Sequence, residues 1–88
     1  MSFVNVGFGN LVQTDKILVI VSPDSAPIKR LVQTAKENNL AIDATSGRRT
    51  RGVVVLSENR VVMSALSPDA IYTRIQNNDR GGGVNGRK

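Results

Sequence analysis

A change in hydrophobic periodicity limits the folds open to this chain more than any other feature. The run KILVIV, residues 16–21, is apolar without alternation, which is typical of a fully buried strand. Residues 25–39 repeat apolar side chains at helical spacing instead. That stripe consists of Ile28, Leu31, Val32 and Ala35. The pattern predicts a strand followed by an amphipathic helix, the one helix of real length in the chain.

The ends of this helix carry recognisable signals. Asp24 or Ser25 can cap its first turn, where a side-chain oxygen accepts a hydrogen bond from a free backbone N–H. Pro27 is tolerated there because its missing N–H would have no partner in the helix. The pair Asn38-Asn39 predicts the end, because asparagine accepts the left-handed conformation.

The remaining apolar runs are short and separated by turn residues. Residues 2–6 and 10–13 read as two extended pieces around a bend at Gly7-Phe8-Gly9. Residues 41–45 and 48–56 flank the turn dipeptide Ser46-Gly47, which predicts a β-hairpin.

The last third of the chain continues this pattern. SENR, residues 57–60, predicts a second turn, and VVMSAL, residues 61–66, predicts a returning strand. SPDAIYTRI then opens a short helix with Ser67 as its cap. Residues 77–88 are rich in glycine and polar residues, and we expect a disordered basic tail after a domain of residues 1–76.

The expected fold is therefore α+β, with a small, mostly antiparallel sheet, one main helix and a short C-terminal helix. A chain of 88 residues without cysteine has a small core and no disulfide to brace it. One helix of real length leaves one face of the sheet bare. We expect a second copy of the chain to close that face, which predicts a homo-oligomer.

Several classes of function are disfavoured. The chain has no cysteine and no histidine, so the commonest metal ligands and the commonest general base are missing. VGFGNLV resembles a phosphate-binding loop only in part, because the third glycine position of that fingerprint is Val12. No nucleophile and base stand out as a pair. We expect no enzyme activity, no cofactor, no metal and no small-molecule substrate.

The N-terminal residues lack a basic leader with an apolar core, and the longest apolar run is far too short to span a bilayer. We expect a cytoplasmic protein that does not enter a membrane.

The segment ATSGRRTRGVVV, residues 44–55, carries the strongest functional signal. Arg48, Arg49 and Arg51 crowd the foot of the expected hairpin, and the chain as a whole has a net charge of +5. Arginine presents a planar fork of donors that suits phosphate oxygens and guanine edges. A solvated turn, or salt bridges to Asp43 or Glu58 across a subunit interface, would explain the same pattern. The scarcity of aromatic residues favours duplex DNA over single strands, which bind by base stacking.

Four segments carry a resemblance to a known family. NVGFGNLV, IVSPDSAPIKRLVQTA, IDATSGRRTR and ALSP occur in the order found in the RemA family of bacterial extracellular-matrix regulators. The resemblance runs from about residue 3 to residue 76. It implies a DNA-binding transcription regulator with a LytTR-like fold that assembles into homo-oligomeric rings. It implies matrix or biofilm genes as targets and a place at the nucleoid.

The resemblance also implies particular DNA-binding residues. The paired arginines of GRRTR are Arg48 and Arg49, with Arg51 assisting, and a basic residue before the apolar strand is Lys16. The family usually has arginine at that last position, and lysine keeps the charge but loses the bidentate geometry. Ser46 stands where a tyrosine is expected, which removes any contact by that ring.

The physical reading and the resemblance lead to one hypothesis. A ring repeats a modest basic surface, so many weak phosphate contacts add up along duplex DNA that bends around the rim. Two alternatives stay open. One is a ring-forming interaction module in which the arginines hold subunits together, and the other is binding of structured RNA.

Overall fold

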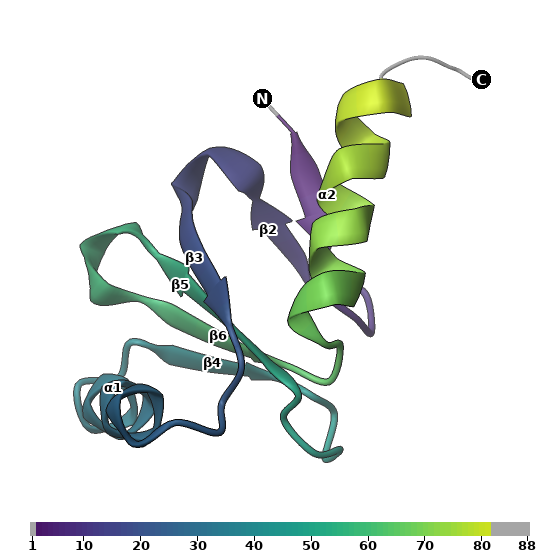
Figure 1. Ribbon diagram of the computed structural model, residues 1–88. Helices are drawn as coiled ribbons and strands as arrows, with labels where there is room; N and C mark the ends of the chain where they lie inside the picture. Colours follow the sequence, from purple (N-terminus) through teal and green to yellow (C-terminus); the bar gives the residue numbers. More distant parts are fainter. Residues whose placement is uncertain (1, 82–88) are drawn as a thin grey trace.

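The computed structural model describes residues 2–81, and within these the side chains of residues 2–77. Figure 1 shows a four-stranded sheet with a helix on one face and a β-hairpin and a second helix on the other. No helix in residues 2–81 is both long and apolar enough to cross a bilayer. The elements are β1 (Phe3–Asn5), β2 (Leu11–Gln13), the 3-10 turn η1 (Thr14–Lys16), β3 (Ile17–Val21), α1 (Ala26–Glu37), β4 (Ala41–Ala44), β5 (Gly52–Leu56), the 3-10 turn η2 (Ser57–Asn59), β6 (Val61–Ser64) and α2 (Pro68–Gly81).

The signals for the helices and turns are confirmed. Ser25 caps α1 by accepting a hydrogen bond from the Ile28 N–H at 3.4 Å, and Asn39 follows the helix with a left-handed φ of 60°. Ser67 caps α2 by accepting from the Ala70 N–H at 3.2 Å. These local signals depend on residues within a few positions of each other, so they can be recognised without the tertiary structure.

The expected hairpin between β4 and β5 is wrong. The sheet has the order β3-β5-β6-β4, so β6 separates the two strands, and β4 runs parallel to β6. Ser46 and Gly47 do form a turn with positive φ values of 53° and 81°, but it lies in a connection that crosses past β6. The sheet is therefore mixed rather than a three-stranded antiparallel meander.

Burial explains this strand order. The central strands β5 and β6 contribute Val53, Val54, Val61 and Val62, all of which are buried. Strands covered on both faces read as continuous apolar runs, and these two have that pattern. β4 carries the exposed Asp43, which an edge strand tolerates better than a central one.

Each face of the sheet has its own core. On one face α1 packs its apolar stripe against Val53 and Val61. On the other face, Val4 and Val12 of the β1–β2 hairpin and Ile71 of α2 cover Val54 and Val62. The expectation that one face stays bare is wrong, because the hairpin and α2 together cover it (Figure 1).

Two further expectations need correction. β3 is an edge strand rather than a fully buried one, and its Leu18 and Val19 remain 66% and 47% exposed. α2 continues to Gly81, so residues 77–81 are helical where the tail was expected to begin. Residues 82–88 of that expected tail lie outside the described residues.

Candidate nucleic-acid interface

The connection between β4 and β5 carries the three clustered arginines. Arg48, Arg49 and Arg51 are all exposed. The Arg48 N–H donates to the Thr45 carbonyl at 3.0 Å, and the Arg51 N–H donates to the Ser64 carbonyl of β6 at 2.8 Å. The backbone of this loop is thus fixed at both ends while the arginine side chains face solvent.

Asp43 shapes the start of this loop. Its Oδ1 accepts hydrogen bonds from the Thr45 hydroxyl and from the Thr45 N–H, the latter at 2.9 Å. These bonds favour the ionised carboxylate and lower the pKa of Asp43, and the charge of Lys36 adds to the effect. Asp43 thus fixes the buried Thr45, and the Thr45 carbonyl in turn accepts the hydrogen bond from the Arg48 N–H. Within the described side chains of one subunit, the Asp43 carboxylate accepts hydrogen bonds from Thr45 and not from an arginine.

Two residues from distant parts of the chain join the arginine loop. Phe8 lies in the turn between β1 and β2, and Arg74 lies on α2. The Arg48 guanidinium carbon is 5.5 Å from the centre of the Phe8 ring, a distance typical of a cation–π contact. Arg74 donates from Nη1 to the Asn5 carbonyl at 2.9 Å, which ties α2 to the end of β1.

Together these residues form a basic hollow of about 540 Å³, here called the arginine surface. It is lined by Gly7, Phe8, Arg48, Arg49, Arg51, Ala65, Leu66 and Arg74. Four of these eight residues are arginines and none is acidic. Within residues 2–77 no carboxylate lies within salt-bridge distance of the four guanidinium groups, so their charges stay available to an anionic partner.

A second hollow of about 290 Å³ adjoins the arginine surface. Arg49 and Arg51 line it together with Thr50 and the α2 cap Ser67. Its one carboxylate is Asp24, which accepts a 3.1 Å hydrogen bond from the Ser22 hydroxyl. The two arginines therefore border both hollows, and the basic region continues toward the start of α2.

Lys16 does not belong to the arginine surface of the same subunit. It precedes Ile17, which pairs with Leu56 at the end of β5, whereas Arg51 precedes Gly52 at the start of β5. A five-residue strand separates the two, which corresponds to roughly 17 Å. Lys16 lines a different hollow together with Arg60 and Glu58. The structure thus brings together three of the four expected residues and leaves Lys16 at the opposite end of the sheet.

The sequence pattern gave no reason to include Phe8 or Arg74. The glycines on either side of Phe8 predict only a bend, and Arg74 lies 23 residues after Arg51 on a separate helix. The one usable signal was an aromatic residue between two glycines, a position where small residues are common. Among the described residues, no three carboxylates gather as a metal site would require.

Residues 3–75 match the model of the RemA-like family, described as extracellular matrix regulatory protein A-like. The chain is 52% identical over 80 residues to a protein of Dictyoglomus thermophilum, which covers 91% of this chain and 94% of that protein. It is 48% identical over 79 residues to a protein of Oceanobacillus iheyensis, covering 90% and 92% of the two chains. Both relatives carry the name "Putative regulatory protein".

Proposed function

The chain belongs to the RemA-like family of regulatory proteins, and from this premise we propose that it regulates transcription by binding duplex DNA as a homo-oligomer. The observation that carries the proposal is the arginine surface, where four guanidinium groups from two elements meet without an acidic residue among its lining. We propose extracellular-matrix genes as the targets, because the family is described as extracellular matrix regulatory protein A-like. A protein bound to chromosomal DNA acts in the cytoplasm, at the nucleoid.

Phosphate is the chemical group that this surface suits best. Guanidinium groups donate paired hydrogen bonds to phosphate oxygens, and each contact releases counterions condensed on the duplex. Arg48, Arg49 and Arg51 are our proposed DNA contacts on the loop. Single strands are bound largely by stacking on exposed rings, and the lining of the arginine surface offers one ring, Phe8, which already contacts Arg48. This favours duplex DNA.

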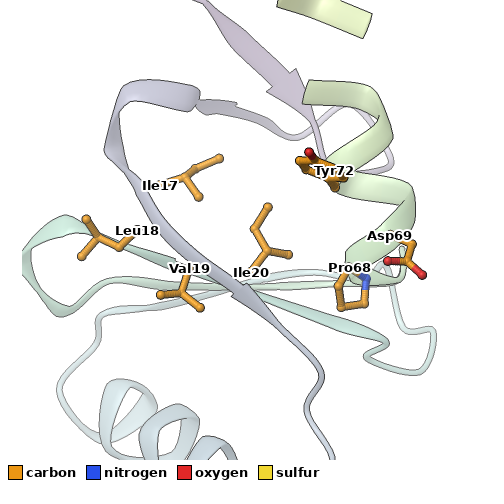
Figure 2. A pocket seen from close by; sticks show the side chains of 7 residues that line it. All are labelled: Ile17, Leu18, Val19, Ile20, Pro68, Asp69 and Tyr72. Atoms are coloured by element: carbon orange, nitrogen blue, oxygen red, sulfur yellow. The ribbon is translucent and has the colours of Figure 1, made fainter. Parts of the chain in front are cut away.

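Self-association is supported by apolar side chains at the sheet edges. On the β3 side, Leu18 and Val19 are exposed, and a hollow of about 390 Å³ lies between β3 and Tyr72 of α2. Figure 2 shows Ile17 and Ile20 on the α2 side of β3, with Leu18 pointing the other way. On the opposite edge, Ile42 of β4 is 51% exposed.

The β3 edge and the β4 edge expose different apolar residues, and this difference determines which kind of subunit contact they can form. When one edge of a subunit packs against the other edge of the next, the contact is heterologous, and such contacts close into rings when the rotation allows it. We therefore propose that a second copy of the chain covers β3, and that repetition of this contact produces a ring. A ring would repeat the arginine surface once per subunit.

Lys16 has a separate place in this proposal. Because it lies a strand length from the loop arginines of its own subunit, it contacts DNA at another point of the path. Its removal should weaken binding independently of Arg48 and Arg49. Additive effects of Lys16→Ala and Arg48→Ala on the binding free energy would support this arrangement.

The test is a salt series of duplex binding with oligomer mass recorded in parallel. Wild type, the double variant Arg48→Ala/Arg49→Ala and the control Arg30→Ala are compared on fragments of the source genome. Arg30 is an exposed arginine on α1 outside the arginine surface, so its substitution removes one charge elsewhere. For the double variant we expect weaker binding, unchanged oligomer mass and a shallower salt slope, by roughly 0.9 for each phosphate that is no longer neutralised.

Two results would overturn the proposal. If the wild type ignores duplex DNA at low salt, the protein does not regulate by direct binding. If the double variant falls to monomers, the arginines hold the subunits together instead. Preference for structured RNA over a duplex of equal length would redirect the proposal to another nucleic acid.

A further inference from the structure

The turn that carries Phe8 has an unusual backbone for an aromatic residue. Gly7, Phe8 and Gly9 have consecutive positive φ values of 113°, 55° and 78°. Glycine adopts such values freely, but a bulky side chain incurs a steric penalty there. Phe8 is also 53% exposed, so burial does not compensate for that penalty. Core packing does not explain a strained backbone at an exposed residue, and such strain is typical of functional sites.

The turn holds Phe8 in one position. The Val6 N–H donates to the Asn10 carbonyl at 2.9 Å, and the Asn10 N–H donates to the Gly7 carbonyl at 3.0 Å. The Asn10 side-chain amide donates to the same Gly7 carbonyl at 2.8 Å. The Asn5 Oδ1 accepts from the Gly7 N–H at 2.7 Å. With its backbone fixed by these hydrogen bonds, the turn presents the ring at a set place on the arginine surface.

Arg48 is the partner of this ring. Its guanidinium carbon lies 5.5 Å from the ring centre, and its backbone N–H is fixed by Thr45. A cation–π contact attracts the positive charge to the face of the ring and supplies no hydrogen-bond acceptor to the guanidinium N–H groups. These donors therefore remain free for phosphate oxygens, whereas the long side chain loses part of its rotational freedom.

We propose that Phe8 is a positioning residue for DNA binding, whose ring holds the Arg48 guanidinium in the orientation that meets the DNA backbone. The proposal rests on the proposed function and adds a residue to it that acts through Arg48. Removal of a cation–π interaction at an exposed site corresponds to a decrease of about two- to fivefold in affinity.

Three substitutions at position 8 separate the ring from the turn. Phe8→Leu removes the ring but keeps an apolar side chain with the same backbone strain. Phe8→Asn also removes the ring but relieves the strain, since asparagine tolerates a positive φ. Phe8→Tyr keeps the ring. We expect Phe8→Leu and Phe8→Asn to weaken duplex binding about two- to fivefold. Phe8→Tyr should bind the duplex with nearly the affinity of the wild type.

The decisive comparison uses the Arg48→Ala background. If Phe8 acts through Arg48, Phe8→Leu has no further effect on affinity once Arg48 is absent. Oligomer mass and the melting temperature, measured on every variant, show whether the fold is kept. Since Phe8→Asn relieves the backbone strain of the turn and Phe8→Leu keeps it, equal decreases of affinity in both variants trace to the loss of the ring.

Each other outcome overturns the proposal in a recognisable way. If Phe8→Leu weakens binding equally with and without Arg48, the ring contacts DNA directly, as a wedge between base pairs would. If Phe8→Leu and Phe8→Asn bind like the wild type while Arg48→Ala does not, the positioning role is wrong and the proposed function stands. If the wild type does not bind duplex DNA, both proposals fall together.

Discussion

The Ser64 hydroxyl donates a 2.6 Å hydrogen bond to the Val6 carbonyl, and both residues are completely buried. The same hydroxyl oxygen accepts from the Leu66 N–H at 3.0 Å, and the Ser64 carbonyl accepts from the Arg51 N–H. One residue of β6 thus joins the Phe8 turn, the arginine loop and the segment leading to α2. The arginine surface depends on this junction because its residues come from all three segments.

Ser64→Ala should destabilise the fold by about 1–3 kcal/mol, because the buried Val6 carbonyl would lose its donor. Urea unfolding measures this free energy. Ser22→Ala is the matched control, since the Ser22 hydroxyl forms an exposed hydrogen bond with Asp24. We expect a change within about 0.5 kcal/mol there. Equal stability of the two variants would show that the junction contributes little.

Gly52→Ala should be more damaging than a glycine-to-alanine change usually is. An added Cβ would lie 2.5 Å from the Leu66 carbonyl oxygen and 3.3 Å from the Ile71 Cδ1. The oxygen belongs to the backbone, so the strand and the segment before α2 must separate. Such overpacking costs roughly 1–3 kcal/mol, occasionally more, which a shift of the urea midpoint would reveal. A variant as stable as the wild type would contradict this close approach.

Asp43 makes the stability depend on pH at the acid end. Its pKa is lowered from 3.8 in the folded state by the hydrogen bonds from Thr45. A lowered folded pKa gives stability that is fully present well above 3.8 and is lost as the pH falls through the folded value. The difference in unfolding free energy between wild type and Asp43→Ala should therefore shrink on acidification below pH 3.8.

Asp43→Asn provides the control for this effect. Its side-chain oxygen can still accept from Thr45, but the group does not titrate in this range. The difference between Asp43→Asn and Asp43→Ala should therefore stay constant with pH. If the difference in unfolding free energy between wild type and Asp43→Ala is also constant with pH, Asp43 contributes no pH-dependent stability.

Leu18→Glu should break self-association with little effect on the isolated fold. Leu18 is 66% exposed on the edge strand β3, so a charged side chain there is tolerated in a single subunit but not beneath a second copy. Light scattering should show a fall in oligomer mass. Thr34→Glu, on the exposed side of α1, serves as the control and should keep the mass of the wild type. An unchanged mass for Leu18→Glu would move the subunit contact away from β3.

Arg74→Ala tests whether α2 contributes to DNA binding. Arg74 lines the arginine surface and donates to the exposed Asn5 carbonyl. If Arg74 neutralises one phosphate, the salt slope should become shallower by roughly 0.9. The stability should change by at most about 1.5 kcal/mol. Arg30→Ala should leave the slope nearer to the wild type. Equal slopes for the two variants would remove Arg74 from the proposed site.

One part of the arginine surface could be predicted from the sequence and another part could not. The loop arginines were recognisable because they are consecutive or nearly so, and their type alone suggests an anionic partner. Phe8 and Arg74 lie 40 residues before Arg48 and 26 residues after it, so only folding makes them neighbours. The displacement of Lys16 to the other end of the sheet is likewise invisible in the sequence, because it follows from the antiparallel register of β3 and β5.

Several local elements could be predicted from the residues alone: the caps at Ser25 and Ser67, the helical stripe of α1 and the left-handed Asn39 after it. These features rest on interactions between residues a few positions apart, which periodicity and residue type reveal. Packing across the whole chain sets two other features: β4 lies parallel to β6 instead of forming a hairpin with β5, and β3 is an exposed edge. Strand order minimises exposed apolar surface over the whole chain, and two strands with similar patterns can exchange places without changing any local signal.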